Sequence, residues 1–258
     1  MFDSGVGGLS VLQHIRQLFP RDRLIYVADS GHVPYGGKPA GYIKQRSHAL
    51  TRFLVSQGAD AIVIACNTAT AAAVTSLREQ FSIPIVGMEP AVKPAVAATR
   101  SGVVGVLATI GTLESARFAA LLERYAGTVE IVTQGCPGLV EQVERGELDS
   151  PRTRELIERY TSPLLARGAD TLILGCTHYP FLAPLIRDVV GDQIALVDTG
   201  AAVARQLLRR IETELPDRTP GDATARFFTS GDAAQATRIM SLLWKSSVVA
   251  QQLPQTYL

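Results

Sequence analysis

Two cysteines in this chain lie in closely similar stretches of sequence. Cys66 lies in GADAIVIACNTATAAAV, which begins at Gly58, and Cys176 lies in GADTLILGCTHYPFLAP, which begins at Gly168. Each stretch reads Gly-Ala-Asp, then a short apolar run of β type, then cysteine with threonine one or two places further on. The thiols are 110 residues apart, so the repeat predicts two similar units that each carry one thiol.

The residues after each cysteine are polar: Asn67 and Thr68 in the first repeat, Thr177 and His178 in the second. Such groups at strand ends can offer hydrogen bonds to a ligand, whereas in a packed core each would need an internal partner. Cysteine is more often a small buried hydrophobic residue. We assign that structural role to Cys136, which lies in GCPGLV and has no counterpart in the repeat. The polar neighbours favour a functional role for the other two cysteines.

Few kinds of chemistry need two thiols across a cleft. A Cys-x-x-Cys redox motif is absent, and Cys176 with His178 would give a metal at most two ligands. A nucleophilic thiol with a histidine base needs only one cysteine. Two thiols best fit acid/base catalysis in which one removes a proton from a carbon and the other delivers one to the opposite face. Both cysteines precede expected helix starts, where the helix dipole favours the thiolate, so we expect lowered thiol pKa values.

The glycine-rich stretch DSGVGGLSVL (3–12) is a second candidate site. Its glycines lack the Gly-x-Gly-x-x-Gly spacing of a dinucleotide fingerprint. We interpret it as a strand-to-helix turn whose amides bind a small anion such as a carboxylate, with helix capping by Asp3 or Ser4 as the alternative. The loop at Tyr35 and Gly36 suits the same role through a hydroxyl group and a closely approaching backbone, with an ordinary turn as the alternative.

Three ionisable residues are candidates to support the thiols. Asp3 and His178 could orient or polarise them, one on each side. Histidine is more often a surface or structural residue, but its place two residues after a strand-end cysteine favours this role. Glu144, in LVEQVERG, has by itself the pattern of a solvated helix residue.

Short apolar runs alternate with longer amphipathic segments along the chain. The runs suit buried parallel strands and occupy 23–29, 61–66, 83–88, 102–108, 129–134, 171–176 and 193–198. Helical spacing and a closing glycine mark 41–58, 112–127 and 152–168. We therefore predict an α/β fold with helices on both sheet faces. Both cysteines then lie at C-terminal strand ends, where ligands bind in open parallel sheets.

A weaker echo of the repeat pairs FDSGVGGL (2–9) with LATIGTLE (107–114) and places Ser4 opposite Thr109. Together the two repeats predict two similar open, mainly parallel-sheet α/β domains related by pseudo-twofold symmetry. The active site is expected in the cleft between them.

We expect the chain to cross between the domains near 87–94, where two prolines discourage a continuous helix, and to return near 197–202. The first domain is then discontinuous and gains a late strand from FFTSGD (227–232). The segment 216–225 reads as an exposed loop. The predicted bounds are 1–91 with 204–258 for the first domain and 92–203 for the second.

Composition limits the classes of function. The chain has 258 residues, 47% hydrophobic and 19% charged, and a net charge of +1. This is typical of a globular protein and gives no electrostatic footprint for nucleic acid or for a membrane surface. No apolar run reaches the roughly 18 residues that span a bilayer, and MFDSGVGG is not a secretory signal. Three cysteines do not make a disulfide framework, so we expect the reducing cytoplasm.

Taken together, these residues resemble the glutamate racemases, a cofactor-independent family of the aspartate/glutamate racemase superfamily. The matching motifs span nearly the whole chain in the family's order, and they are FDSGVGGLSVL, VPYGGK (33–38), ACNTAT (65–70), GMEPAVKPA (87–95), GCTHYP (175–180) and TSGD (229–232).

The resemblance implies interconversion of L- and D-glutamate, which supplies D-glutamate for peptidoglycan, without metal or organic cofactor. It implies that Cys66 and Cys176 are the two acid/base groups. Its supporting polar residues correspond to Asp3, His178 and Glu144, and its substrate-binding residues to Asp3, Ser4, Tyr35, Gly36, Asn67, Thr68, Thr177 and His178. The partner is glutamate, with no nucleic acid or membrane, and a homodimer is left open.

The start of the chain departs from the family pattern. Family members carry several apolar residues before Phe-Asp-Ser, and these form the first strand of the sheet. Here Asp3 follows only two residues, so we expect that strand to be nearly absent. Either the true start lies upstream, with Met1 an internal residue, or Asp3 and Ser4 lie on an unanchored terminus that frays.

Three alternatives stay open on sequence grounds. A racemase for aspartate or a hydantoin shares the superfamily pattern. A pyridoxal phosphate racemase would need a suitable lysine, and none of the four lysines ends a core strand. A non-catalytic amino-acid-binding protein with two lobes would share the cleft but would have no use for paired thiols.

Overall fold

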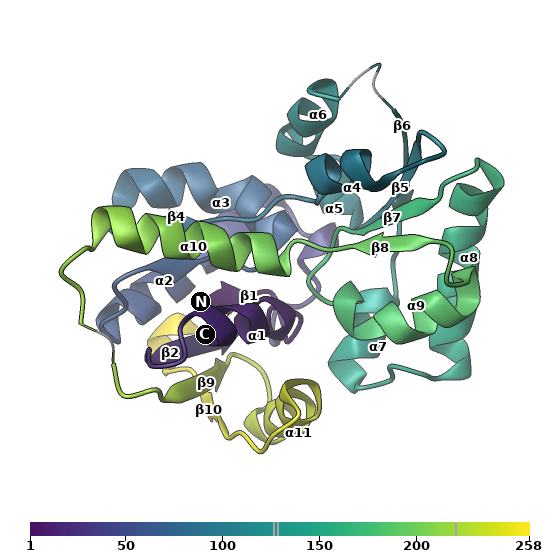
Figure 1. Ribbon diagram of the computed structural model, residues 1–258. Helices are drawn as coiled ribbons and strands as arrows, with labels where there is room; N and C mark the ends of the chain where they lie inside the picture. Colours follow the sequence, from purple (N-terminus) through teal and green to yellow (C-terminus); the bar gives the residue numbers. More distant parts are fainter. Residues whose placement is uncertain (126, 128, 220) are drawn as a thin grey trace.

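The computed structural model describes residues 1–125, 127, 129–219 and 221–258. Its strands form parallel sheets in two groups, which lie on opposite sides of the molecule in Figure 1. The first group contains a sheet of order β1-β2-β9-β10 and a separate pair, β3-β4. A bridge between Phe2 and Ile64 links the two. The strands of this group are β1 (Phe2–Asp3), β2 (Leu24–Ala28), β3 (Ile62–Val63), β4 (Ile85–Val86), β9 (Ala225–Thr229) and β10 (Ala250–Gln252).

The second group is one sheet of order β6-β5-β7-β8. Its strands are β5 (Val103–Ala108), β6 (Glu130–Gly135), β7 (Thr171–Leu174) and β8 (Ala195–Val197). In both groups the strand that leads to a cysteine, β3 or β7, pairs with the next strand along the chain. It also bridges or pairs with the strand of the weaker echo, β1 or β5. The two sequence repeats therefore correspond to equivalent strands.

Helices cover both groups of strands (Figure 1). Around the first lie α1 (Leu9–Leu18), α2 (Ala40–Ser56), α3 (Asn67–Gln80), α10 (Gly200–Glu214), α11 (Ala233–Trp244) and the 3-10 turns η1 (Tyr35–Gly37) and η3 (Gln255–Tyr257). Around the second lie α4 (Val92–Ala98), α5 (Ile110–Leu113), α6 (Ala116–Glu123), α7 (Leu139–Arg145), α8 (Pro151–Ala166), η2 (Tyr179–Leu182) and α9 (Ala183–Val190).

The α/β fold and the seven strands predicted from the apolar runs are confirmed. The late strand in FFTSGD is also confirmed, because β9 pairs with β2. One predicted helix is wrong: the segment 112–127 contains the end of α5 and then a separate helix, α6. Ser115 interrupts it by capping α6, with its hydroxyl accepting from the Phe118 amide at 3.2 Å. Position 126 lies outside the described residues.

The N-terminal strand is short, as predicted, but the alternative of an unanchored terminus is wrong. The amine of Met1 donates to the Ile25 carbonyl at 2.7 Å, and burial lowers the pKa of that amine to about 5. The Phe2 carbonyl accepts from the Ala65 amide at 2.8 Å, and the Asp3 carbonyl accepts from the Asp29 amide at 3.0 Å. These contacts on both sides fix the turn that follows β1.

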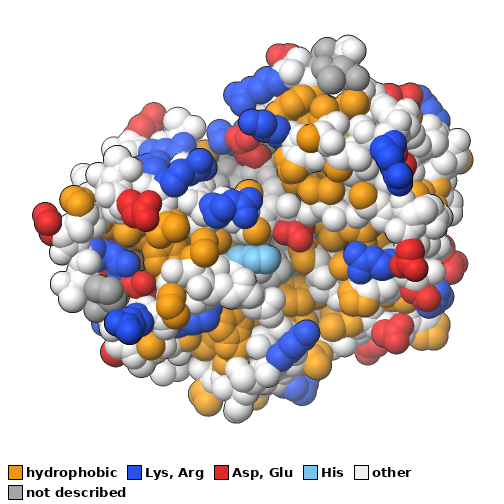
Figure 2. Space-filling view, viewed as in Figure 1, with side chains coloured by type: hydrophobic (Ala, Val, Ile, Leu, Met, Phe, Trp, Pro, Cys, Tyr) orange, Lys and Arg blue, Asp and Glu red, His pale blue; other side chains and the backbone are white. Residues whose placement is uncertain are grey.

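Charged side chains of both signs lie on the face of the molecule that Figure 2 shows. They are interspersed over this face, in line with the net charge of +1. Among the described residues, no helix combines the length and apolar character that crossing a bilayer would require.

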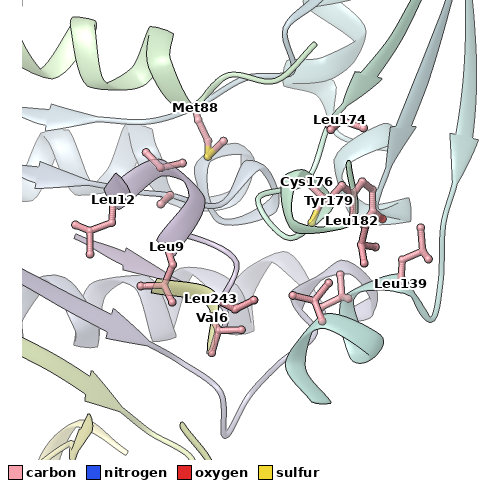
Figure 3. Close-up of a cluster of buried hydrophobic side chains, with 14 of the residues drawn as sticks. Val6, Leu9, Leu12, Met88, Leu139, Leu174, Cys176, Tyr179, Leu182 and Leu243 are labelled. Atoms are coloured by element: carbon pink, nitrogen blue, oxygen red, sulfur yellow. The ribbon is translucent and has the colours of Figure 1, made fainter. Parts of the chain in front are cut away.

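A single cluster of buried apolar side chains continues from the first group of elements into the second. It includes Val6 and Leu9 at the start of α1, and Leu139, Cys176 and Tyr179 beside the second sheet. Figure 3 shows Leu9 and Val6 on one side of this region and Tyr179, Leu182 and Leu139 on the other. Because this packing is continuous, the residues after β1 lie close to those after β7.

Candidate active site

Both repeated cysteines line one cavity. Cys66 and Cys176 are 6% and 8% exposed, and each follows the C-terminal end of its strand. The cavity walls come from both groups of elements and comprise Ser4, Pro34, Tyr35, Gly36, Cys66, Asn67, Thr68, Thr109, Thr112, Val140, Gly175, Cys176, Thr177 and His178. The remaining cysteine, Cys136, is buried away from this cavity, and burial raises the pKa of its thiol to about 12.

Cys66 is the N-cap of α3. Its sulfur accepts from the Ala69 amide at 3.4 Å, and its thiol donates to the Ser4 hydroxyl at 3.8 Å. The expected lowering of its pKa is wrong in this structure: burial raises the pKa of Cys66, the nearby Asp3 adds to the rise, and the Ala69 amide only partly offsets it. An added anion stabiliser, or access of water, would be needed to favour the thiolate.

Cys176 has a different environment. A turn and the 3-10 segment η2 follow it, so it does not cap an α-helix as Cys66 does. Its sulfur lies 3.6 Å from Nδ1 of His178, whose Nε2 lies 2.7 Å from Oε1 of Glu144. Burial disfavours the imidazolium, but the hydrogen bonds and charges of Cys176 and Glu144 outweigh it and raise the pKa of His178 well above its ordinary value. A protonated imidazole at this position stabilises a thiolate.

Asp3 supports the site from behind the cavity wall. Its carboxylate is fully buried and accepts from the Ser4 and Gly8 amides at 2.7 and 2.6 Å and from the Thr177 hydroxyl at 3.1 Å. Burial raises the pKa of Asp3 to about 6, although His178 and the two amides oppose this rise. Asp3 thus joins the turn after β1 to the residue that follows Cys176.

The glycine-rich turn binds the protein's own carboxylates. Besides the two amides held by Asp3, the Val6 amide donates to Oε1 of Glu144 at 2.6 Å. The glycines make this approach possible: a Cβ on Gly5 would lie 1.9 Å from Glu144, and one on Gly7 would lie 2.3 Å from His178. The small anion that we expected at these amides is therefore, at three of them, a side chain of the same chain.

Asn67 connects the two repeats directly. Its Nδ2 donates at 2.9 Å to the carbonyl of Gly175, the residue before Cys176. Its Oδ1 is buried and has no hydrogen-bond partner among the described residues. Because an unpaired buried acceptor is costly, this oxygen suits a donor group of a ligand, such as an ammonium group.

Three threonine hydroxyls meet on another wall of the cavity. Thr68 lies 2.9 Å from Thr109 and 3.1 Å from Thr112, and the latter two lie 2.9 Å apart. Gly36 contacts the same region, since a Cβ there would lie 2.8 Å from that of Thr109. Thr109 and Thr112 are not among the site residues predicted from the sequence. The weaker repeat, which places Ser4 opposite Thr109, indicates a site role for Thr109.

The structure gathers most of the predicted site residues around this cavity. Ser4, Tyr35, Gly36, Asn67, Thr68, Thr177 and His178 line it together with the two cysteines. Asp3 and Glu144 lie outside the lining and contact it through other residues. Among the described residues, no group of three or more His, Cys, Asp or Glu side chains is arranged to hold a metal ion.

The cavity is narrow in this conformation. Its free volume is only about 10 Å³, the room that a single water molecule takes. A ligand with several heavy atoms can enter only if the walls move apart. A cavity of about 510 Å³ lies at the opposite ends of the strands, beside Met1 and Ile25, and contains neither thiol. We place the candidate site at the smaller cavity because the chemically reactive groups meet there.

The structure thus places paired thiols at equivalent strand ends of two similar α/β units, around one cavity whose walls come from both. The chain belongs to the Asp/Glu/hydantoin racemase family, whose model matches residues 8–207.

Individual relatives agree with this assignment. The chain is 62% identical to the glutamate racemase of Ectopseudomonas mendocina over 245 residues, covering 94% of this chain and 93% of that protein. It is 58% identical to the glutamate racemase of Methylococcus capsulatus, covering 98% and 94%. Among solved structures, it matches Escherichia coli glutamate racemase in complex with L-glutamate and the activator UDP-MurNAc-Ala. That match has a TM-score of 0.88 at 34% identity and covers 98% of this chain and 96% of that one.

Proposed function

We propose that this protein is an isomerase that interconverts L- and D-glutamate and so supplies D-glutamate for peptidoglycan synthesis. The observation that carries the proposal is the pair of cysteines, Cys66 and Cys176, on one cavity in a chain 62% identical to a glutamate racemase. Glutamate is the small-molecule partner, and the cytoplasm is the expected location. A homodimer is left open.

In the proposed mechanism, each cysteine acts on one face of the α-carbon, one as a thiolate and the other as a thiol. Cys176 removes the α-proton of L-glutamate while Cys66 donates its thiol proton to the opposite face, which yields D-glutamate. The reverse reaction exchanges these roles. His178, held by Glu144, favours the thiolate of Cys176, and no metal or organic cofactor takes part.

The remaining cavity groups are proposed to hold the substrate. The unpaired Oδ1 of Asn67 suits the ammonium group. Hydroxyls of Ser4, Thr68 and Thr177, with the backbone at Tyr35 and Gly36, suit the two carboxylates. Asp3 is proposed to act by orienting Ser4 and Thr177, which donate to it. The two domains are proposed as 1–91 with 204–258 and 92–203, separating to admit the substrate.

The test is a direct assay of each enantiomer. Purified protein, without added metal or pyridoxal phosphate, is incubated with L- or D-glutamate and followed by optical rotation, with both aspartate enantiomers in parallel. Decay of either glutamate signal to zero is expected. A protein that racemises aspartate but not glutamate would refute the substrate, and inhibition by a chelator with recovery on adding metal would refute the cofactor-free mechanism.

A further inference from the structure

One wall of the cavity is held by a buried ion pair that lies outside it. The hydroxyl of Tyr35, a residue only 1% exposed, donates to Oδ2 of Asp29 at 2.5 Å. Arg46 donates to the same carboxylate twice, from Nε to Oδ2 at 3.0 Å and from Nη2 to Oδ1 at 2.7 Å. Asp29 and Arg46 do not line the cavity, whereas Tyr35 does, so Tyr35 connects the ion pair to the cavity wall.

The ion pair joins segments that are far apart in the chain. Asp29 follows β2, and its amide donates to the carbonyl of Asp3 at 3.0 Å, one residue before Ser4 of the cavity wall. Arg46 comes from α2, and its Nη2 also donates to the carbonyl of Tyr257 in η3 at 2.9 Å. Tyr35 is therefore anchored to a strand end, a helix and the C-terminal turn at once.

The backbone around Gly36 packs tightly against α5 and the residue before it. Next to Tyr35, a Cβ on Gly36 would lie 2.8 Å from the Cβ of Thr109. A Cβ on Gly111 would lie 2.8 Å from the carbonyl oxygen of Gly36. The backbone at Gly36 thus approaches α5 as closely as glycine allows, and a small displacement of Tyr35 would shift it against the threonine hydroxyls.

We propose that Arg46 is a positioning residue for substrate binding, acting through Asp29 and Tyr35 to hold Gly36 at the cavity wall. The inference rests on the proposed racemase function, since the bound ligand is glutamate. The guanidinium is needed for its shape as well as its charge, because only its planar fork reaches both carboxylate oxygens and the Tyr257 carbonyl. A lysine would keep the charge and lose this geometry.

The experiment measures KM and kcat for both glutamate enantiomers in Arg46→Lys, Tyr35→Phe and the double variant. Each single change is expected to raise KM by about tenfold, with a smaller change in kcat, because each removes a hydrogen bond to a buried charge. In the double variant the second change should add little, since both act on one wall. The matched control is Arg16→Lys: Arg16 donates to four backbone carbonyls of the first group of elements, away from the cavity, and its loss should lower stability without raising KM.

Several results would overturn the proposal. Effects on KM that add fully in the double variant, or that Arg16→Lys reproduces, would reduce Arg46 to a general structural role. If Arg46→Lys does not fold, Tyr35→Phe alone decides, and an unchanged KM for that variant contradicts the mechanism. Failure of the proposed function would look different: the unchanged protein would then racemise neither glutamate enantiomer, and the positioning role would fall with it.

Discussion

Gly7 faces the imidazole that lies beside Cys176, and the change Gly7→Ala tests whether that imidazole must stay in place. The added methyl would lie 2.3 Å from Nδ1 of His178, whereas ordinary contacts begin at 3.4 Å. Relief would require the ring or the turn to move by about 1 Å, which is enough to break a hydrogen bond. His178 cannot move freely, because it is 1% exposed and its Nε2 is bound to Glu144 at 2.7 Å.

Two consequences of Gly7→Ala can be given magnitudes. Overpacking a filled site costs about 1–3 kcal/mol of stability, so the protein should still fold at moderate temperature. In the proposed mechanism His178 supports Cys176, and loss of an acid/base contribution lowers kcat by about 100-fold or more, so displacing His178 should lower kcat on this scale. Because the proposed mechanism uses both thiols in either direction, kcat should fall for L- and D-glutamate alike.

Optical rotation gives kcat in both directions, and urea unfolding gives the stability of the same preparation. The matched control is Gly37→Ala, in η1, where an added Cβ meets no atom within 4 Å. It should leave kcat and stability close to those of the unchanged protein. An unchanged kcat in Gly7→Ala would refute the argument that a glycine is needed at this position to make room for His178. Equal losses of kcat in Gly7→Ala and Gly37→Ala would assign the effect to the loss of glycine flexibility.

Three further outcomes are expected. Cys66→Ser and Cys176→Ser should each lower racemisation in both directions by about 100- to 10,000-fold, and a variant that racemises at the normal rate would contradict the two-thiol mechanism. Gly36→Ala should raise KM, because its Cβ would lie 2.8 Å from that of Thr109; an unchanged KM would show that the wall yields. Burial raises the pKa of Asp3 from 3.8 to about 6, so the folded protein keeps a proton that the unfolded chain releases. The free energy of unfolding should therefore fall from pH 4 to pH 6, and urea unfolding of Asp3→Asn should lack that part of the fall.

The parts of the site that follow strand ends could be predicted from the sequence. The apolar runs before Cys66 and Cys176 locate the C-terminal ends of β3 and β7, and parallel topology gathers such ends at one edge. The repeat supplies the rest of the argument, because equivalent strands of two similar units place equivalent residues face to face. Asn67 and Thr177 were found by the same reasoning, as the polar residues that follow.

The parts that depend on long-range side-chain contacts could not be predicted. Glu144 has the local pattern of a solvated helix residue, yet it reaches the Val6 amide, 138 positions away in the chain. The residues around Gly5 in the sequence do not indicate that the carboxylate of Glu144, from α7, contacts this glycine. Likewise, Asp29 and Arg46 read as an ordinary strand-end acid and a helix surface base. Their role depends on where Tyr35 lies after the chain has folded.

The two thiols are equivalent in the repeat but not in their surroundings. Cys66 receives an amide hydrogen bond at the start of α3 and lies beside a hydroxyl, whereas Cys176 lies beside an imidazole held by a carboxylate. Burial raises the pKa of Cys66, whereas the imidazole beside Cys176 has its own pKa raised by Cys176 and Glu144. The repeat determines where the two thiols lie, and the residues around each one give it a different electrostatic environment.

This asymmetry cannot favour one product. The two enantiomers have equal free energies in water, so the equilibrium constant is one, and kcat/KM must be equal in the two directions. Any difference between the surroundings of the thiols must then leave kcat/KM equal for the two enantiomers, although kcat and KM can each differ between them. The unlike supports of the two cysteines can therefore make kcat and KM differ between the enantiomers, while the ratio of products at equilibrium stays at one.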